Sequence, residues 1–245
     1  MAFISEENLD SGSARPPGRP KNRVLDPELI TDAALVLLRT SGLRGLTMRG
    51  LARQLDVAPS ALYNHVASRA AVLAAIQERF AARLDTSGFG TASLRDALDR
   101  WAWSYLRQLR ERPELVPLIV QVPIAQTPRT SWMYQRVIAG FAAAGWPDES
   151  IIASMSILET FIFGSALDFP GPEDVYAPDR RADTSVLNRA YSAYARAVDE
   201  IGASQRDAVF SIGLDAILIG LHHRWGSGRG WPKPPLRAQR PASTS

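Results

Sequence analysis

Two short apolar-patterned segments, separated by a tight break, constrain the fold of this chain more than any other feature. They lie in GLTMRGLARQLDVAPSALYNHV, residues 45–66. Leu51 and Ala52 lie on one helical face before the break, and Leu62 and Val66 follow at helical spacing after it. Helices joined by so short a turn cross steeply, so a small side chain is needed where they meet, and Ala52 supplies it. The stretch predicts two short, steeply crossed helices.

Helix start and stop signals extend this pattern in both directions. Asp26 caps an expected preceding helix that Gly42 closes, and Ser68 begins a following helix with an apolar stripe to about Leu84. The turn between the two short helices needs a residue that tolerates left-handed backbone. Asp56 stands there, although glycine adopts that conformation more easily.

The rest of the chain keeps helical periodicity, and strand alternation does not persist anywhere in it. Helices are expected over residues 94–110, 131–144, 148 to about 167, from 185 onward, and 204 to about 224. The sequence therefore predicts an all-α fold.

Composition divides the chain into four regions. Residues 1–24 form a flexible basic arm, and residues 25–84 form a small domain that we call the headpiece. The stretch DTSGFGTAS, residues 85–93, predicts the boundary to a larger helical domain over residues 90–226. Residues 227–245 are expected to be a disordered tail.

Positive charge is concentrated in the headpiece and the arm before it. Residues 15–83 carry 11 Lys and Arg against 5 Asp and Glu, whereas residues 84–245 carry 17 of each. Such asymmetry favours a polyanionic partner, although a solvated basic surface accounts for most asymmetries of this size. Between Asp32 and Asp56 there is no acidic residue, and the arginines there are Arg39, Arg44, Arg49 and Arg53.

The second short helix is expected to present polar side chains outward, and a short helix of this kind fits the DNA major groove. Small residues at Ser60 and Ala61 permit close approach to bases, while Tyr63 and His65 can reach phosphates. The helix start at Ser68, with Arg69 beside it, is a further candidate phosphate site. The outward side chains are Ser60, Ala61, Tyr63, Asn64 and His65.

The segment LTMRGLARQLDVAPSALYNHVASRAAVLAAI, residues 46–76, resembles the DNA-binding domain of the TetR family of transcriptional regulators. Its LYNHV–SR–AVL portion resembles the tetracycline-repressor branch, and the resemblance covers about residues 26–84. It implies a three-helix helix-turn-helix domain, a larger helical ligand-binding and dimerisation domain, and binding of a homodimer to a palindromic operator in double-stranded DNA. We expect a repressor that a small effector releases, with an effector that promotes DNA binding as the open alternative.

The resemblance further implies DNA contacts outside the second short helix. Thr47 and Arg49 would start the supporting helix, with Arg49 near a base edge or a phosphate. Arg69 would stand where the family usually has lysine. Asp56 replaces the commoner glycine, and Pro59 with Ser60 matches no known readout pair, so no operator sequence follows.

The basic arm contains Gly18-Arg19-Pro20, which is similar to an AT-hook core. Such a core lies in a narrow minor groove with its arginine, here Arg19, inserted. The alternative is a disordered, solubilising leader.

Aromatic residues after position 100, together with a few polar ones, are candidates for an effector cavity. A small apolar effector, aromatic or polycyclic, would suit them, and the Pro- and Gly-bearing loop at 168–184 could gate its entry. The alternative for each residue is ordinary core packing. The candidates are Trp101, Trp103, Tyr105, Gln108, Trp132, Gln135, Glu159, Phe163 and Asp168.

Two helices predict a symmetric dimer because they are apolar over more than one face, which an isolated surface would not tolerate. They span about residues 149–167 and 205–223. Small residues at helical spacing would allow close approach between subunits. These are Ser156, Gly164, Gly213 and Gly220.

Other functions find little support. The chain has no cysteine, so thiolate chemistry and disulfides are excluded. Its histidines, His65, His222 and His223, do not have the spacing of a metal site, and no nucleophile–base pair or cofactor motif is visible. Lacking a signal peptide or a membrane span, the chain is expected in the cytoplasm. An architectural DNA-binding protein without an effector remains the alternative, and a helical enzyme is a third hypothesis.

Overall fold

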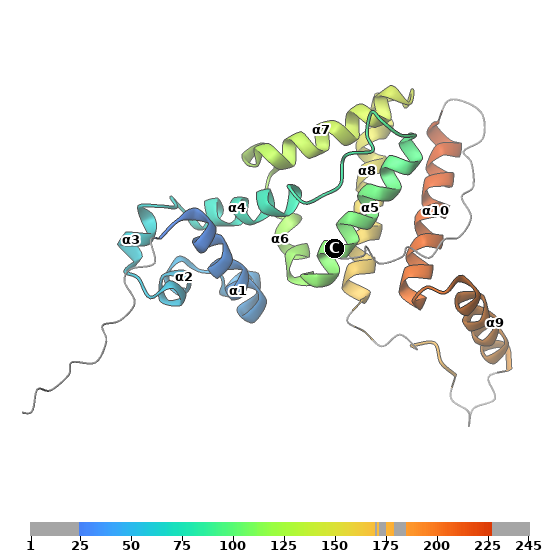
Figure 1. Ribbon diagram of the computed structural model, residues 1–245, viewed down its shortest axis with the longest axis horizontal. Coiled ribbons are helices and arrows are strands. Elements are labelled where there is room, and N and C mark those ends of the chain that lie inside the picture. Colours follow the sequence, from blue (N-terminus) through green and yellow to red (C-terminus); the bar gives the residue numbers. More distant parts are fainter. Residues whose placement is uncertain (1–24, 170, 172–174, 179–184, 227–245) are drawn as a thin grey trace, which may run out of the picture.

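The computed structural model describes residues 25–169, 171, 175–178 and 185–226, which form helices joined by turns and loops (Figure 1). The arm with Arg19 and the tail after residue 226 lie outside the described residues. The predicted all-α fold is confirmed for the described part of the chain.

The headpiece lies at one end of the molecule and α4 connects it to the larger domain (Figure 1). Its elements are α1 (Pro27–Gly45), α2 (Met48–Leu55), α3 (Pro59–Tyr63) and α4 (Arg69–Ala81). Asp26 caps α1 as predicted, because its Oδ1 accepts from the Leu29 amide at 2.7 Å. The expected end at Gly42 is a kink instead: Gly42 has φ 66°, and helical structure resumes up to Gly45.

The break between α2 and α3 is built from left-handed backbone at Asp56, with φ 56° and ψ 45°. The amide of Val57 donates to the Ala52 carbonyl at 3.0 Å and so satisfies the end of α2. Ala52 and Leu62 are buried, as the crossing of two short helices requires. This turn fixes the direction in which α3 leaves the domain.

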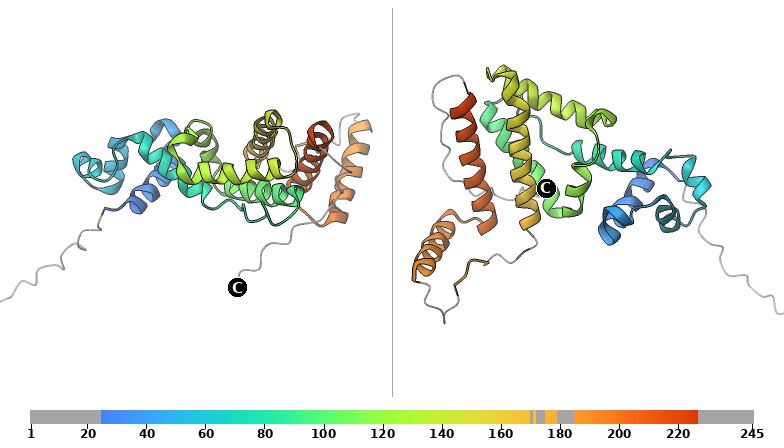
Figure 2. Two further views of the ribbon diagram at one scale, coloured as in Figure 1. Left: turned by 90° about the horizontal axis from the view of Figure 1, so that it is seen from above. Right: turned by 180° about the vertical axis from the view of Figure 1, so that it is seen from behind.

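The larger domain contains three long helices that run side by side, α5, α8 and α10, with α7 crossing them near one end (Figure 1). The helix α9 lies at the far end from the headpiece, and its main contact is with α10 (Figure 2). Three short helical turns between α5 and α7 were not predicted, because prolines at 113, 117 and 123 interrupt the periodicity there. The elements are α5 (Leu94–Glu111), η1 (Pro113–Leu115), α6 (Val116–Ile119), η2 (Ile124–Gln126), α7 (Pro128–Ala143), α8 (Asp148–Asp168), α9 (Ser185–Ile201) and α10 (Gln205–Trp225).

The segment at residues 85–93, which the sequence marks as a boundary, is packed against the larger domain. The Asp85 amide donates to Ser104 Oγ at 2.9 Å, and the Phe89 side chain is 4% exposed. A Cβ on Gly140 would lie 2.5 Å from the Phe89 ring, so glycine is needed there to admit it. One hydrophobic cluster consequently extends from α1 to α10 without interruption.

A second connection joins the headpiece to the larger domain through Glu78 of α4. Its carboxylate accepts from the backbone amides of Arg129 and Thr130, at 2.9 and 3.0 Å, and from the Thr130 hydroxyl at 3.3 Å. These amides belong to the first turn of α7, where helical amides have no partner within the helix. A side chain of α4 therefore caps α7.

Candidate functional site

The end of α3 presents the polar side chains that the sequence assigned to DNA. Ser60, Asn64 and His65 are exposed, Tyr63 is 52% exposed, and Ala61 is half-buried. Leu62, fully buried between them, anchors this short helix to the headpiece core. The arrangement leaves a small-residue surface at Ser60 and Ala61 with larger polar groups beyond it.

The start of α2 adds two of the predicted residues to this end of the molecule. Thr47 is exposed, but its hydroxyl accepts from the Gly50 amide at 3.0 Å and thus caps the helix. Arg49 is exposed on the first turn of α2. Arg49 is therefore a predicted DNA contact whose side chain is exposed and positively charged.

Arg69, predicted as a phosphate contact, has partners within the headpiece that the sequence did not indicate. Its Nε donates to the Leu46 carbonyl and its Nη2 to the Leu43 carbonyl, both at 2.6 Å. A lysine could not reproduce this geometry, because a guanidinium presents its donors in a rigid fork. Arg69 therefore ties the start of α4 to the end of α1.

The aromatic cavity expected near the centre of the larger domain is filled by the aromatic rings themselves. Trp101 and Tyr105 are fully buried, with ring centroids 5.4 Å apart. Tyr105 also contacts Phe80 at 5.1 Å and Phe163 at 5.7 Å. Such edge and tilted contacts are typical of a packed core, so these residues support the fold rather than line a cavity.

Glu159, another predicted effector residue, is held in a polar cluster inside the same core. The hydroxyls of Tyr105 and Tyr134 both donate to its Oε1, the former at 3.3 Å. Burial raises the pKa of the Glu159 carboxyl, and the two tyrosine hydrogen bonds oppose that rise. Burial, reinforced by the nearby carboxylate, likewise raises the pKa of both tyrosine hydroxyls. The cluster connects α5, α7 and α8.

The other predicted effector residues are dispersed. Trp103 is buried against Phe210, with ring centroids 4.7 Å apart. Trp132 is 59% exposed beneath the Arg136 guanidinium, and Gln135 is exposed on the same helix. Gln108 is half-buried near the junction of α4 and α5 and has a buried Nε2 without a partner among the described residues.

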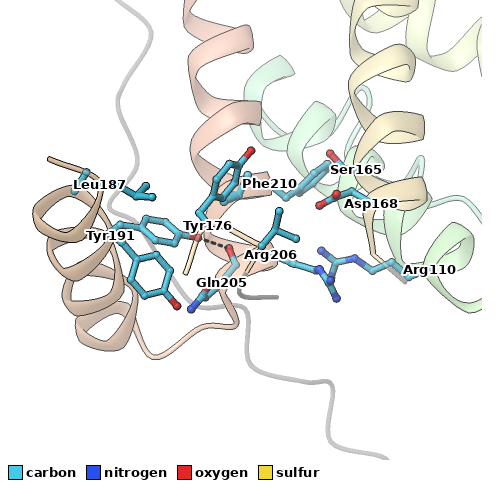
Figure 3. A pocket seen from close by; sticks show the side chains of 13 residues that line it. Arg110, Ser165, Asp168, Tyr176, Leu187, Tyr191, Gln205, Arg206 and Phe210 are labelled. Atoms are coloured by element: carbon cyan, nitrogen blue, oxygen red, sulfur yellow. Dashed lines mark hydrogen bonds between the residues drawn. The ribbon is translucent and has the colours of Figure 1, made fainter. Parts of the chain in front are cut away.

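A cavity of about 560 Å³ lies between the ends of α5 and α8, the helices α9 and α10, and Val175 and Tyr176 of the connecting loop (Figure 3). Of the predicted effector residues, Asp168 alone lines it. The sequence signal that could have located it is the tyrosine spacing in AYSAYA, which puts Tyr191 and Tyr194 on one face of α9. The remaining lining residues are Arg110, Ser165, Leu187, Ala190, Gln205, Arg206, Val209 and Phe210.

Long exposed faces of α8 and α10 carry apolar and small side chains. On α8, Ile152 is 60% and Leu167 55% exposed. By length and composition α8 is the one described helix that could cross a membrane, yet 39% of its apolar window is buried in the protein. The exposed faces consist of Ile152, Ala153, Ser156, Ile157, Thr160, Gly164 and Leu167 on α8, and Val209, Ile212, Ala216, Ile219 and Gly220 on α10.

The glycines on these helices have two different environments. A Cβ on Gly213 would lie 2.5 Å from the Phe161 ring, so this glycine allows α10 to approach α8 within the subunit. The predicted use of Gly213 between subunits is thus replaced by one inside the chain. Gly164 and Gly220 have no atom within 4 Å of such a Cβ and leave space on the outer face.

Two family descriptions match the chain. The family of bacterial regulatory proteins named after tetR matches residues 30–76, and the tetracycline repressor-like C-terminal domain matches residues 88–225. The chain belongs to the TetR family. Its helix-turn-helix headpiece is a DNA-binding domain of a transcriptional regulator, and TetR-family proteins are DNA-binding regulators rather than enzymes.

Several known proteins are similar over more than four fifths of the chain. The HTH-type transcriptional repressor DrrR1 of Streptomyces coeruleorubidus is 22% identical over 91% of this chain and 86% of its own. ActR of Streptomyces coelicolor, solved in complex with actinorhodin, has a TM-score of 0.65 at 19% identity, covering 84% of this chain and 99% of that one. BioQ, solved with its double-stranded DNA operator, has a TM-score of 0.55 at 20% identity, covering 82% and 99%.

Proposed function

We propose that this TetR-family protein is a cytoplasmic repressor that binds a palindromic operator as a homodimer and is released by a small-molecule effector. The observation that carries the proposal is the exposed polar end of α3, held outward by the buried Leu62. The similar protein BioQ was solved with its operator, ActR with a small molecule, and DrrR1 is named a repressor.

Docking of α3 into the major groove assigns a role to each exposed side chain. Ser60 and Ala61 are short enough to let the helix approach base edges. Tyr63 and His65 reach phosphates on the flanking backbone, and Arg49 neutralises a phosphate or contacts a base. Thr47 and Asn64 lie beside these groups, and Arg69 offers its Nη1 to a phosphate while its other nitrogens hold the backbone.

The exposed faces of α8 and α10 are proposed as the dimer interface. A face of this composition is costly in water but normal between subunits. Gly164 and Gly220 would let helices of the two subunits approach closely. A two-fold dimer would place its two headpieces on successive turns of the major groove, which matches a palindromic operator.

The cavity beside α9 and α10 is proposed as the effector site. Its volume of about 560 Å³ is within the range of small-molecule pockets. A ligand that binds more tightly to a dimer whose two headpieces cannot reach successive turns of the major groove would lower the affinity for the operator. A tenfold loss of operator affinity needs about 1.4 kcal/mol of differential binding.

Operator binding can be tested by measuring affinity against salt concentration for single variants of the full chain. The operator would first be isolated by selection from random palindromes. Arg49→Gln should weaken binding and lower the slope of log affinity against log salt by about 1.8, because one phosphate in each half-site of the palindrome loses its cation and each contributes about 0.9. Tyr63→Phe should weaken binding with an unchanged slope, because a neutral hydrogen bond releases no counterion.

Ser60→Ala provides the matched comparison because it changes a proposed base contact. It should alter the preferred sequence rather than the salt slope. Arg196→Gln on α9, at the opposite end of the molecule, serves as the control and should change neither quantity. Unchanged operator affinity in both Arg49→Gln and Tyr63→Phe would refute the docking geometry.

A further inference from the structure

The cavity beside α9 contains two arginine side chains in a wall that otherwise mixes aromatic, aliphatic and polar residues. Arg110 reaches it from α5 and Arg206 from α10 (Figure 3). Both guanidinium groups lie over the ring of Phe169, with centroid distances of 4.7 and 5.1 Å. Aromatic rings from α9, α10 and the loop complete the wall: Tyr176, Tyr191, Tyr194 and Phe210.

The two arginines at this site differ in their partners among the described residues. Arg110 forms an ion pair with Asp207, and Arg206 donates to the backbone carbonyl of Gly171. A carbonyl does not neutralise a guanidinium, so Arg206 has no carboxylate partner among the described residues. Asp168, which also lines the cavity, is not within ion-pair distance of either arginine in the described part of the chain.

Arg110 also has hydrogen-bonding capacity that the protein does not use. Its side chain is 13% exposed, and its Nε is buried without a hydrogen-bond partner among the described residues. Arg110 is one of the residues that line the cavity, so its guanidinium lies beside the space that a ligand would occupy. An anionic oxygen suits the guanidinium groups of Arg110 and Arg206 best, since charge-assisted hydrogen bonds to a guanidinium are the strong ones.

We propose that the effector of this protein is an aromatic acid: a flat ring system that packs among the tyrosines and carries a carboxylate, sulfonate or ionised phenol held by Arg206 and Arg110. The inference rests on the proposed effector site and specifies its chemistry. It replaces the purely apolar ligand that the sequence favours, because the sequence alone does not bring the two arginines together. The tyrosines bind the rings by stacking, and the arginines select the charge.

The test compares two fluorescent probes that share their rings and differ in charge. The anionic probe is 8-anilinonaphthalene-1-sulfonate, and the neutral one is N-phenyl-1-naphthylamine. A purely apolar site would favour the neutral probe, since it is the more hydrophobic. With the full-length dimer we expect the sulfonate to bind at least about tenfold more tightly, which corresponds to about 1.4 kcal/mol.

Variants of lining residues assign the preference to this cavity. Arg206→Gln should lower the affinity for the sulfonate probe by about tenfold and leave the affinity for the neutral probe unchanged. Asp168→Asn should raise the affinity for the sulfonate probe, since a repelling carboxylate is removed. Ala190→Trp, which fills the space from the exposed side of α9, should abolish binding of both probes. Arg196→Gln, an exposed position of α9 outside the cavity lining, is the matched control.

Equal affinity of the two probes for the wild-type protein would overturn the proposal. The proposal would also be overturned if Arg206→Gln and Arg196→Gln lowered the affinity for the sulfonate probe by the same factor. Operator affinity is measured in parallel on the same samples. Sulfonate binding with the expected variant pattern but unchanged operator affinity would support the ligand class and refute the release step of the proposed function.

Discussion

The contact between Glu78 and the first turn of α7 yields a prediction that separates a coupling device from incidental packing. Glu78→Ala removes an acceptor for two backbone amides and one hydroxyl. Loss of a helix-capping acceptor costs about 0.5–2 kcal/mol, and a charged acceptor lies at the upper end of that range. For a chain of this size, about 1 kcal/mol lowers the melting temperature by about 2–4 °C. We therefore expect a decrease of about 4–8 °C for Glu78→Ala.

Glu78→Gln should give a smaller decrease, because its carbonyl oxygen can still accept one amide bond while its NH₂ group faces the other. The assay is thermal unfolding by circular dichroism at one fixed protein concentration, since the melting temperature of a dimer depends on concentration. Glu149→Gln is the matched control: Glu149 is an exposed acid in the first turn of α8. Its loss removes only a few tenths of a kcal/mol of interaction with the helix dipole, so the melting temperature should fall by about 1 °C.

The same substitution tests transmission between domains. If α7 moves α4 through Glu78, Glu78→Ala should reduce the factor by which 8-anilinonaphthalene-1-sulfonate lowers operator affinity, while the affinity of the protein for the probe stays the same. An unchanged melting temperature in both Glu78 variants would refute the capping argument. A lower melting temperature with an unchanged release factor would refute the transmission argument alone.

The remaining predictions concern the dimer, the core and pH. Gly220→Glu should raise the dimer dissociation constant at least about 100-fold in sedimentation, since a buried unpaired charge costs several kcal/mol; Ala142→Glu, exposed on α7, should leave it unchanged. Gly213→Ala should destabilise the fold by about 1–3 kcal/mol in urea because its methyl group would meet the Phe161 ring; an unaltered midpoint would contradict this. The pKa of Glu159 is raised in the folded protein, so the folded protein holds this proton more tightly than the unfolded chain does. The stability that this protonation contributes is complete below the ordinary pKa of 4.5 and is lost as pH rises through the raised pKa. The melting temperature of Glu159→Gln should therefore rise relative to wild type across that interval, and parallel pH profiles would exclude this account.

Local features of the fold could be predicted from the sequence because the residues that produce them are neighbours in the chain. The caps at Asp26 and Ser204 each bond to an amide three residues later. The left-handed turn at Asp56 closes a bond between Val57 and Ala52. Each of these depends on a few consecutive residues, so a pattern of residue types is sufficient to locate it.

Features that depend on the path of the whole backbone could not be predicted. The carbonyls that Arg69 binds lie 23 and 26 residues earlier in the chain. Asp215, which interrupts an apolar helix, pairs with Arg95 at a separation of 120 residues. The position of the cavity could not be predicted for a related reason: large aromatic side chains can either surround a space or fill it, and Trp101 and Tyr105 are fully buried in the core. The space lies where α9 stands apart from the bundle, and residue type alone does not indicate that.

The packed segment at residues 85–93 limits how this protein can be recombined with its relatives. A hybrid regulator that joins this headpiece to another sensing domain would need a crossover point, and a loop between domains is the usual choice. Here that loop carries Phe89 into a notch that Gly140 keeps open, and Glu78 before it caps a helix beyond it. A crossover anywhere within the loop would separate Glu78 from α7, and one after Phe89 would also separate Phe89 from Gly140. Functional hybrids should therefore retain residues 140 and 128–130 from the same parent as the headpiece, or replace the entire α4–α7 contact together.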